Sequence, residues 1–276
     1  MPSAGSTLAS TVFRWFRDRF RPSRGPSDGA SRGSSDGASH GPSHGRSRRI
    51  ALGLIVGLVG LAAIGVVAST LTLGADPENE TVRVTRPAEG SLRVLFAGDS
   101  ITYGLSAEDK DLGYRPLMVD ALSAGGPVTE LRANRAGADT GVVSGILNAP
   151  ANLDLAIIEL GTNDVVEKTP LPRFETVYGA LLDRIRHESP AVPLLCVGTW
   201  GSEGGADGSD AYNAVIEDEC GERGGAFVSL YGLYPVEANR GPAGRDVFGG
   251  TSDNFHPNDR GYRAIAELLL ARISVD

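Results

Sequence analysis

Short apolar runs alternate with longer amphipathic stretches over the last two thirds of the chain. The apolar runs predict buried β-strands, and the stretches between them predict helices. Strands that alternate with helices imply a parallel sheet covered on both faces, in one α/β domain with an ample core. We expect strands at residues 92–97, 128–133, 153–160, 193–199 and 226–230, and helices at 114–123, 140–147, 173–188, 212–222 and 259–273, the last with Asn258 as its N-cap.

The amino-terminal third has a different pattern. Residues 50–73 carry no charge and consist of apolar and small residues, enough for a helix of roughly 36 Å that spans a bilayer. Residues 1–49 contain nine arginines and three aspartates, and residues 22–49 are built mainly from Gly, Ser, Pro, Arg and Asp. That composition predicts a largely disordered basic tail. Residues 74–91 are expected to be a polar linker to a domain at 92–276.

Charges beside the apolar run predict its orientation. Arg46, Arg48 and Arg49 precede it, so the positive-inside rule places the amino terminus in the cytoplasm and the domain outside. A cleaved signal peptide is the competing interpretation, but the run exceeds the usual signal-peptide core of about 7–15 residues. We therefore expect a retained single-pass signal anchor. Residues 8–20 fit a membrane-surface amphipathic helix and an unstructured tail equally well.

Charge and cysteine content narrow the classes of partner. The chain has a net charge of −8 although its first 49 residues are basic, so the remainder is strongly acidic. An acidic domain is a poor match for nucleic acid, and neutral substrates are expected. Cys196 and Cys220 are the only cysteines. They form either a disulfide, which we slightly favour, or two buried thiols, and they are too few for a zinc site.

The candidate nucleophile is a serine just beyond the first strand. The strand breaks at Gly98, so Ser100 lies on the turn at its carboxyl end, where open α/β sheets place reactive groups. A serine hydroxyl needs a base to take its proton. His256 is the candidate base because Asp253 precedes it by three residues and can reach Nδ1, which leaves Nε2 for Ser100.

The other histidines are weaker candidates. His40 and His44 lie in the low-complexity tail, and His187 lies in a charged helix end that predicts a solvated residue.

Four sequence blocks together point to a family. They are Gly98-Asp99-Ser100, Asn134-Arg135-Ala136-Gly137-Ala138-Asp139-Thr140, Gly161-Thr162-Asn163-Asp164 and Asp253-x-x-His256. In this order they resemble the SGNH, or GDSL, hydrolases over residues 92–274. The second block departs slightly, since it has Gly-Ala-Asp-Thr where many members have Gly-Asp-Thr. The resemblance implies a flavodoxin-like, three-layer α/β/α fold with a five-stranded parallel sheet.

The resemblance also implies roles for individual residues. Ser100, Asp253 and His256 would be catalytic, and the oxyanion hole would consist of the backbone N–H groups of Ser100 and Gly137 and the side-chain amide of Asn163. Asp99 and Asp164 more plausibly support their loops through backbone hydrogen bonds. Neither a metal nor an organic cofactor is expected.

These features predict a membrane-anchored extracytoplasmic serine esterase. The glycine-rich loops at residues 201–208 and 235–252 offer no long apolar surface, which favours a short acyl group, such as acetyl, on a carbohydrate or another polar alcohol. Tyr103, Tyr114 and Trp200 are candidates for stacking on a sugar, or else ordinary core and rim aromatics. The alternatives are a lipase or thioesterase for longer acyl chains, and a non-catalytic cell-surface carbohydrate-binding protein of the same fold.

Overall fold

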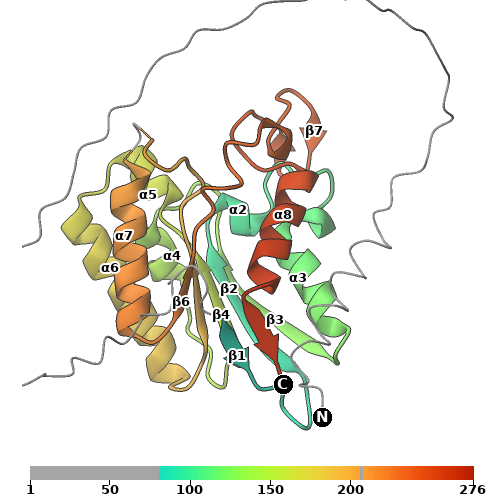
Figure 1. Cartoon of the computed structure of the whole chain (residues 1–276), viewed down its shortest axis with the longest axis vertical. Coiled ribbons are helices and arrows are strands. Elements are labelled where there is room, and N and C mark those ends of the chain that lie inside the picture. Colours follow the sequence, from blue (N-terminus) through green and yellow to red (C-terminus); the bar gives the residue numbers. More distant parts are fainter. Residues whose placement is uncertain (1–80, 206–207) are drawn as a thin grey trace, which may run out of the picture. The chain divides into compact units, whose positions relative to one another are not determined.

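Five parallel strands form the central sheet of the computed structural model, which describes residues 81–205 and 208–276 (Figure 1). Their spatial order is β3-β2-β4-β5-β6. Because β2 is the first of these strands along the chain, this is the flavodoxin-like order, as expected. The strands are β2 (Leu92–Gly98), β3 (Val128–Asn134), β4 (Leu155–Glu159), β5 (Leu194–Val197) and β6 (Ala226–Val228).

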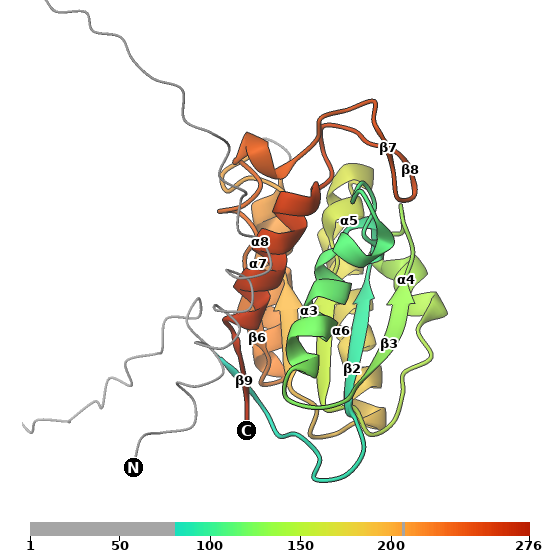
Figure 2. The same cartoon turned by 90° about the vertical axis from the view of Figure 1, so that its right-hand side faces the viewer.

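Helices cover both faces of this sheet, which confirms the three-layer arrangement (Figure 2). One face packs against α3 (Tyr114–Ser123) and α8 (Asp259–Leu270), and the other against α4 (Thr140–Ile146), α6 (Leu171–Glu188) and α7 (Ser209–Glu222). Shorter elements are α2 (Ser100–Tyr103), α5 (Thr162–Glu167), two 3₁₀ turns at Lys110–Leu112 and Glu237–Asn239, and the hairpin of β7 (Asp246–Val247) and β8 (Gly250–Thr251).

Alternation along the strands explains why they read as unbroken apolar runs. Val94 and Phe96 of β2 join the core on the side of α3 and α8, whereas Leu95 and Ala97 join the core on the other side. Successive side chains of a strand point to opposite faces, and both faces are buried here.

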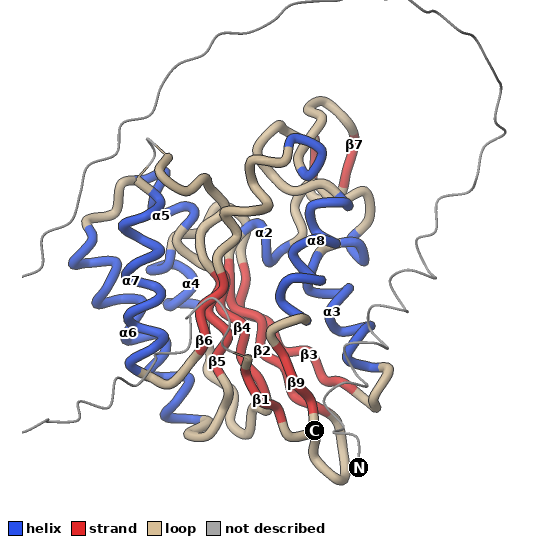
Figure 3. The backbone as a smooth tube through the Cα atoms, viewed as in Figure 1, coloured by secondary structure: helices blue, strands red, loops and turns tan. Residues whose placement is uncertain are grey.

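The structure differs from the predicted boundaries at both ends of the domain. Val82–Val84, in the predicted linker, forms β1 and pairs in parallel with β9 (Ile273–Val275), at the end of the predicted last helix (Figure 3). Both valines of β1 are buried. The ordered domain therefore includes residues 82–84, and α8 ends at Leu270. Three-residue strands are too short to show a period.

The predictions for the amino-terminal third lie outside the described residues. These are the basic tail, the amphipathic helix and the membrane anchor at residues 50–73. Within residues 81–205 and 208–276, no helix combines the length and apolarity required to cross a bilayer.

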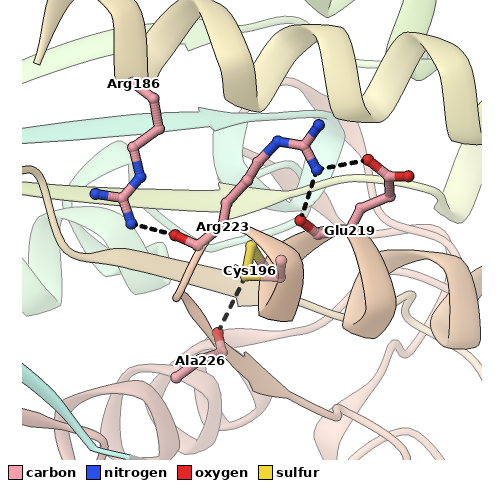
Figure 4. The surroundings of a disulfide bond; sticks show 6 residues. Arg186, Cys196, Glu219, Arg223 and Ala226 are labelled. Carbon is pink, nitrogen blue, oxygen red and sulfur yellow. Dashed lines mark hydrogen bonds and ion pairs between the residues drawn. A yellow bond between two sulfur atoms is a disulfide. The ribbon is translucent and has the colours of Figure 1, made fainter. Parts of the chain in front are cut away.

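A disulfide joins Cys196 of β5 to Cys220 of α7, both fully buried, which confirms the favoured alternative (Figure 4). Beside it, Arg223 at the end of α7 forms ion pairs with Glu219 and with Asp183 of α6, while Arg186 of α6 donates to the Arg223 carbonyl. The carboxyl end of α7 is thus tied covalently to the sheet and electrostatically to α6.

Removal of this disulfide should lower the free energy of unfolding of the domain. The bond spans 24 residues, for which the loop-entropy account gives about 3 kcal/mol of unfolding free energy. We expect Cys196→Ala/Cys220→Ala to lose about that much in urea titrations. Alanine is chosen because a buried serine hydroxyl would need a new partner. A reducing agent should shift the midpoint of the wild type and leave the variant unchanged; equal shifts in both would contradict the prediction.

Candidate active site

Local structure fixes Ser100 at the carboxyl end of β2. Asp99 is the N-cap of α2, where its Oδ1 accepts the N–H of Ile101 at 2.9 Å, and Gly104 ends the helix with a φ of 91°. Gly98 is required by close packing, because a Cβ there would collide with the Thr102 side chain and lie 2.6 Å from the Glu159 carbonyl. The serine therefore begins a single helical turn seated directly on the sheet.

His256 connects Ser100 to Asp253 by hydrogen bonds. Its Nε2 lies 3.0 Å from the Ser100 Oγ, and its Nδ1 lies 2.7 Å from Oδ2 of Asp253. Oδ1 of Asp253 accepts the backbone N–H groups of Phe255 and His256. Burial raises the pKa of Asp253, but the hydrogen bonds from His256 and Phe255 outweigh burial and lower it. An ionised Asp253 thus orients the imidazole toward the serine.

Aromatic side chains hold the segment that carries His256. Trp200 Nε1 donates to the Phe255 carbonyl at 2.8 Å, and the Phe255 ring meets the His256 ring edge-on, with centroids 5.2 Å apart. Tyr234 packs against both Trp200 and Phe255, and Arg240 lies over the Tyr234 ring. Trp200 is only 2% exposed, so its interpretation as a sugar-stacking residue is wrong.

Asn163 lies between the two loops of the predicted oxyanion hole. It is the second residue of α5, and its Nδ2 donates to Oδ2 of Asp99 at 3.1 Å and to the Ala138 carbonyl at 3.0 Å. Both amide hydrogens thus have acceptors in this structure. A developing oxyanion would take over the hydrogen from the Ala138 carbonyl, because an ionised acceptor bonds more strongly than a neutral one.

The two predicted backbone donors face no competing acceptor. No hydrogen bond from the N–H of Ser100 or of Gly137 occurs among the described residues. Gly137 is exposed, has a φ of 72°, and would meet no atom within 4 Å if it carried a Cβ. Its need for glycine is therefore conformational.

Asp164 ties the second block to the third. Its Oδ2 accepts the N–H and the Oγ1 of Thr140, at 2.9 and 2.7 Å, and Asp139 caps α4 by accepting the N–H of Val142. The loop that carries Gly137 is thereby fixed to the start of α5. Asp99 and Asp164 make the supporting contacts that the sequence predicts for them.

Sequence reasoning missed a buried polar group below Ser100. Glu159, the last residue of β4, accepts the backbone N–H and the Oγ1 of Thr102 on one oxygen, and the Tyr114 hydroxyl bonds to Thr102 Oγ1 at 2.7 Å. Tyr114 is fully buried, so it is not a sugar-stacking residue. The only signal in the sequence was a carboxylate in an otherwise apolar strand.

The β7–β8 hairpin lies against the segment after α2. Its Phe248 stacks on Tyr103, with centroids 5.1 Å apart, and pairs through its backbone with Ser106 and Ala107. Both rings are half-buried, so Tyr103 remains a candidate for substrate contact. His187 is exposed and pairs with Glu188, as expected of a solvated residue.

The described part of the chain contains no evident set of metal ligands. No group of three or more His, Cys, Asp or Glu side chains is arranged to hold an ion there.

The sequence and this fold place the chain in a family. Residues 96–264 match the model of the GDSL-like lipase/acylhydrolase family, so the chain belongs to that family and is a carboxylic-ester hydrolase. A purely carbohydrate-binding role is therefore not supported. A comparison with curated proteins gave no match.

Solved structures share the fold at low sequence identity. TesA superposes with a TM-score of 0.54 at 20% identity, covering 64% of this chain and 96% of that one. The psychrotrophic esterase EstA from Pseudoalteromonas sp. gives 0.52 at 16% identity over 66% and 96%. The acetyl xylan esterase AlAXEase gives 0.51 at 20% identity over 65% and 98%. These likenesses establish the SGNH hydrolase fold.

The contacts of Asn163 generate a kinetic prediction. Asn163→Ala removes the side-chain donor of the predicted oxyanion hole, so kcat should fall by about 10²–10³ while KM changes much less. Steady-state kinetics on a p-nitrophenyl ester would measure both constants, with the thermal midpoint as the folding control. A change in KM alone would make Asn163 a substrate-binding residue instead.

Proposed function

We propose that the protein is a serine esterase in which Ser100 is the nucleophile, His256 the general base and Asp253 the group that orients the imidazole. The observation that carries this proposal is the hydrogen-bond chain from Asp253 through His256 to Ser100, with distances of 2.7 and 3.0 Å. Such a chain has the geometry that nucleophilic serine catalysis requires.

The reaction follows from this arrangement. Ser100 Oγ attacks the acyl carbon as its proton moves to His256 Nε2, and the negative carbonyl oxygen is met by the N–H groups of Ser100 and Gly137 and by the Asn163 amide. The tetrahedral intermediate collapses, and the alcohol leaves with the proton from His256. Water, deprotonated by His256, then attacks the acyl-enzyme, and release of the carboxylic acid restores Ser100.

The preferred substrate is a short acyl ester, such as acetyl, of a carbohydrate or another polar alcohol. The half-buried Tyr103–Phe248 pair supports it, since Tyr103 belongs to the same helical turn as Ser100 and an aromatic face suits a sugar ring. The fold is also that of a solved acetyl xylan esterase.

A second candidate is an esterase or thioesterase for longer acyl chains. Val166 lies three residues after Asn163 and is 68% exposed, and Val142 and Ile146 of α4 are exposed as well. Apolar side chains near the oxyanion loops would suit a fatty acyl chain better than a polar one.

The proposed location is the outer side of the cell membrane, with residues 50–73 as the anchor and the amino terminus in the cytoplasm. The Cys196–Cys220 disulfide supports it, because disulfides persist in oxidising compartments outside the cytosol.

Ser100→Ala should abolish ester hydrolysis and leave the fold intact. The test uses the purified protein on p-nitrophenyl esters of increasing chain length and on an acetylated polysaccharide such as acetyl xylan. We expect the highest kcat/KM on acetyl esters, and covalent labelling of Ser100 by a phosphonate. Highest kcat/KM on long chains would favour the second candidate, and full activity of the alanine variant would refute the serine mechanism.

The proposed membrane orientation predicts that only the amino-terminal segment is protected from an external protease. A protease added to intact cells should degrade the domain after residue 74 and spare residues 1–49, as followed with a tag at each end. A soluble domain beginning near Ser69 would instead demonstrate cleavage and exclude the anchor.

A further inference from the structure

A buried polar cluster under the nucleophile has no part in the steps above. It consists of Asp99, Thr102, Tyr114 and Glu159, of which none is more than 1% exposed. Buried polar atoms are costly unless they are hydrogen-bonded, so the bonds of the cluster reveal where its protons lie.

The hydrogen bonds assign a proton to Glu159. Its Oε2 accepts the N–H and the Oγ1 of Thr102, at 3.2 and 2.9 Å, whereas its buried Oε1 receives no donor from the described residues. Glu159 lies opposite Gly98 in the register of β2 and β4, and its carboxyl group bonds to Thr102 of the helical turn that Asp99 caps. Interaction between the two carboxyl groups raises the pKa of Glu159 and opposes the rise in the pKa of Asp99. Two neighbouring buried carboxyl groups do not both ionise, and Oε2 already accepts two hydrogen bonds, so the proton of a neutral Glu159 lies on Oε1.

Asp99 connects Glu159 with the residues of the proposed site. Its Oδ1 caps α2 through Ile101, and its Oδ2 accepts the Asn163 amide at 3.1 Å. Burial raises the pKa of Asp99 to about 6, while the Ile101 N–H and Glu159 oppose that rise. Burial and the charge of Asp99 raise the pKa of Glu159 well above its ordinary value. At neutral pH, Asp99 therefore carries the charge and Glu159 the proton.

We propose that Glu159 is a positioning residue of this esterase: its protonated carboxyl donates to Asp99 and so keeps Asp99 able to hold the Asn163 amide in the oxyanion hole. This inference rests on the proposed function, because it assigns Glu159 an effect on catalysis only through Asn163.

Other titratable and charged groups face the cluster, and none donates to Oε1 within the described residues. They are Arg115 of α3, Asp164 of α5, Tyr178 of α6, His256 before α8 and Tyr262 of α8. Arg115 is engaged by the Thr102 carbonyl and by Glu130. Among the groups that face the cluster, protonated Glu159 is thus the proposed donor to Asp99.

Two substitutions at Glu159 test the assignment. Glu159→Leu removes the donor to Asp99, and we expect kcat to fall about tenfold or more, as for loss of a hydrogen bond to a charged group, with KM within about threefold. Glu159→Gln should restore kcat to within about threefold of the wild type. Its amide can donate to Asp99 while its carbonyl accepts from Thr102.

The pH profile separates this role from simple packing. Without the Glu159 donor the pKa of Asp99 rises, so the acid limb of kcat should move to higher pH in Glu159→Leu and stay in place in Glu159→Gln. Both variants keep His256, so Glu159→Gln serves as the reference for the position of the limb. A shifted limb or a tenfold loss in Glu159→Gln would overturn the proposal, even if Glu159→Leu fails to fold.

Two further variants serve as controls. Thr102→Val removes the Oγ1 bond to Glu159 but changes neither carboxyl group, so it should not move the acid limb. A shift equal to that of Glu159→Leu would mean that Glu159 acts through Thr102. Tyr178→Phe removes a buried hydroxyl that has no hydrogen-bond partner in the described structure, and it should leave kcat and its pH profile unchanged.

A double-mutant cycle distinguishes failure of this inference from failure of the proposed function. If Glu159 acts through Asn163, adding Glu159→Leu to Asn163→Ala should cost less than about threefold in kcat. Multiplying losses would overturn the inference alone. Wild-type kcat in Asn163→Ala would also overturn the inference alone, whereas wild-type kcat in Ser100→Ala would overturn the proposed function and the inference with it.

Discussion

The register of three parallel strands is the constraint on which the site depends. Gly98 of β2 lies opposite Asn134 of β3 on one side and opposite Glu159 of β4 on the other. All three strands therefore leave the sheet at the same level, and the segments that follow them meet there. Ser100, Gly137 and Asn163 are distant in sequence, yet each comes two to four residues after this common level. Because parallel strands end at one edge, a single pairing scheme brings together the proposed nucleophile and all three proposed oxyanion donors.

Carboxyl groups at this edge differ in their protonation because their surroundings differ. The Asp253 side chain is 49% exposed and accepts three hydrogen bonds, so it stays ionised beside the imidazole. Asp99 and Glu159 are fully buried, and burial raises the pKa of both. The carboxyl groups that we infer to be ionised are those that contact residues of the proposed site: Asp253 bonds to His256, and Asp99 accepts the Asn163 amide. With the proton on Glu159, as we propose, the buried pair carries one negative charge rather than two.

The sequence predicted the elements whose signal is local. Strands buried on both faces are continuous apolar runs, and Asn258 was recognisable as a cap; it accepts the N–H groups of Arg260 and Gly261. By contrast, α2 and α5 have four and six residues and exist because the sheet and their caps hold them. Periodicity cannot reveal such helices. Residue type alone does not show whether an aromatic side chain faces substrate. The sequence therefore left Trp200 and Tyr114 open between sugar stacking and ordinary packing, and the structure places both in the core.

The pairing of β1 with β9 also determines where the chain enters the domain. β1, β9 and the carboxyl terminus lie at the end of the central sheet where its strands begin. Helices α2 and α5 lie at the other end, where the strands finish (Figures 1 and 3). The described chain therefore begins and ends at the edge of the sheet opposite to Ser100, so neither β1 nor β9 competes for space with the segments that form the candidate site.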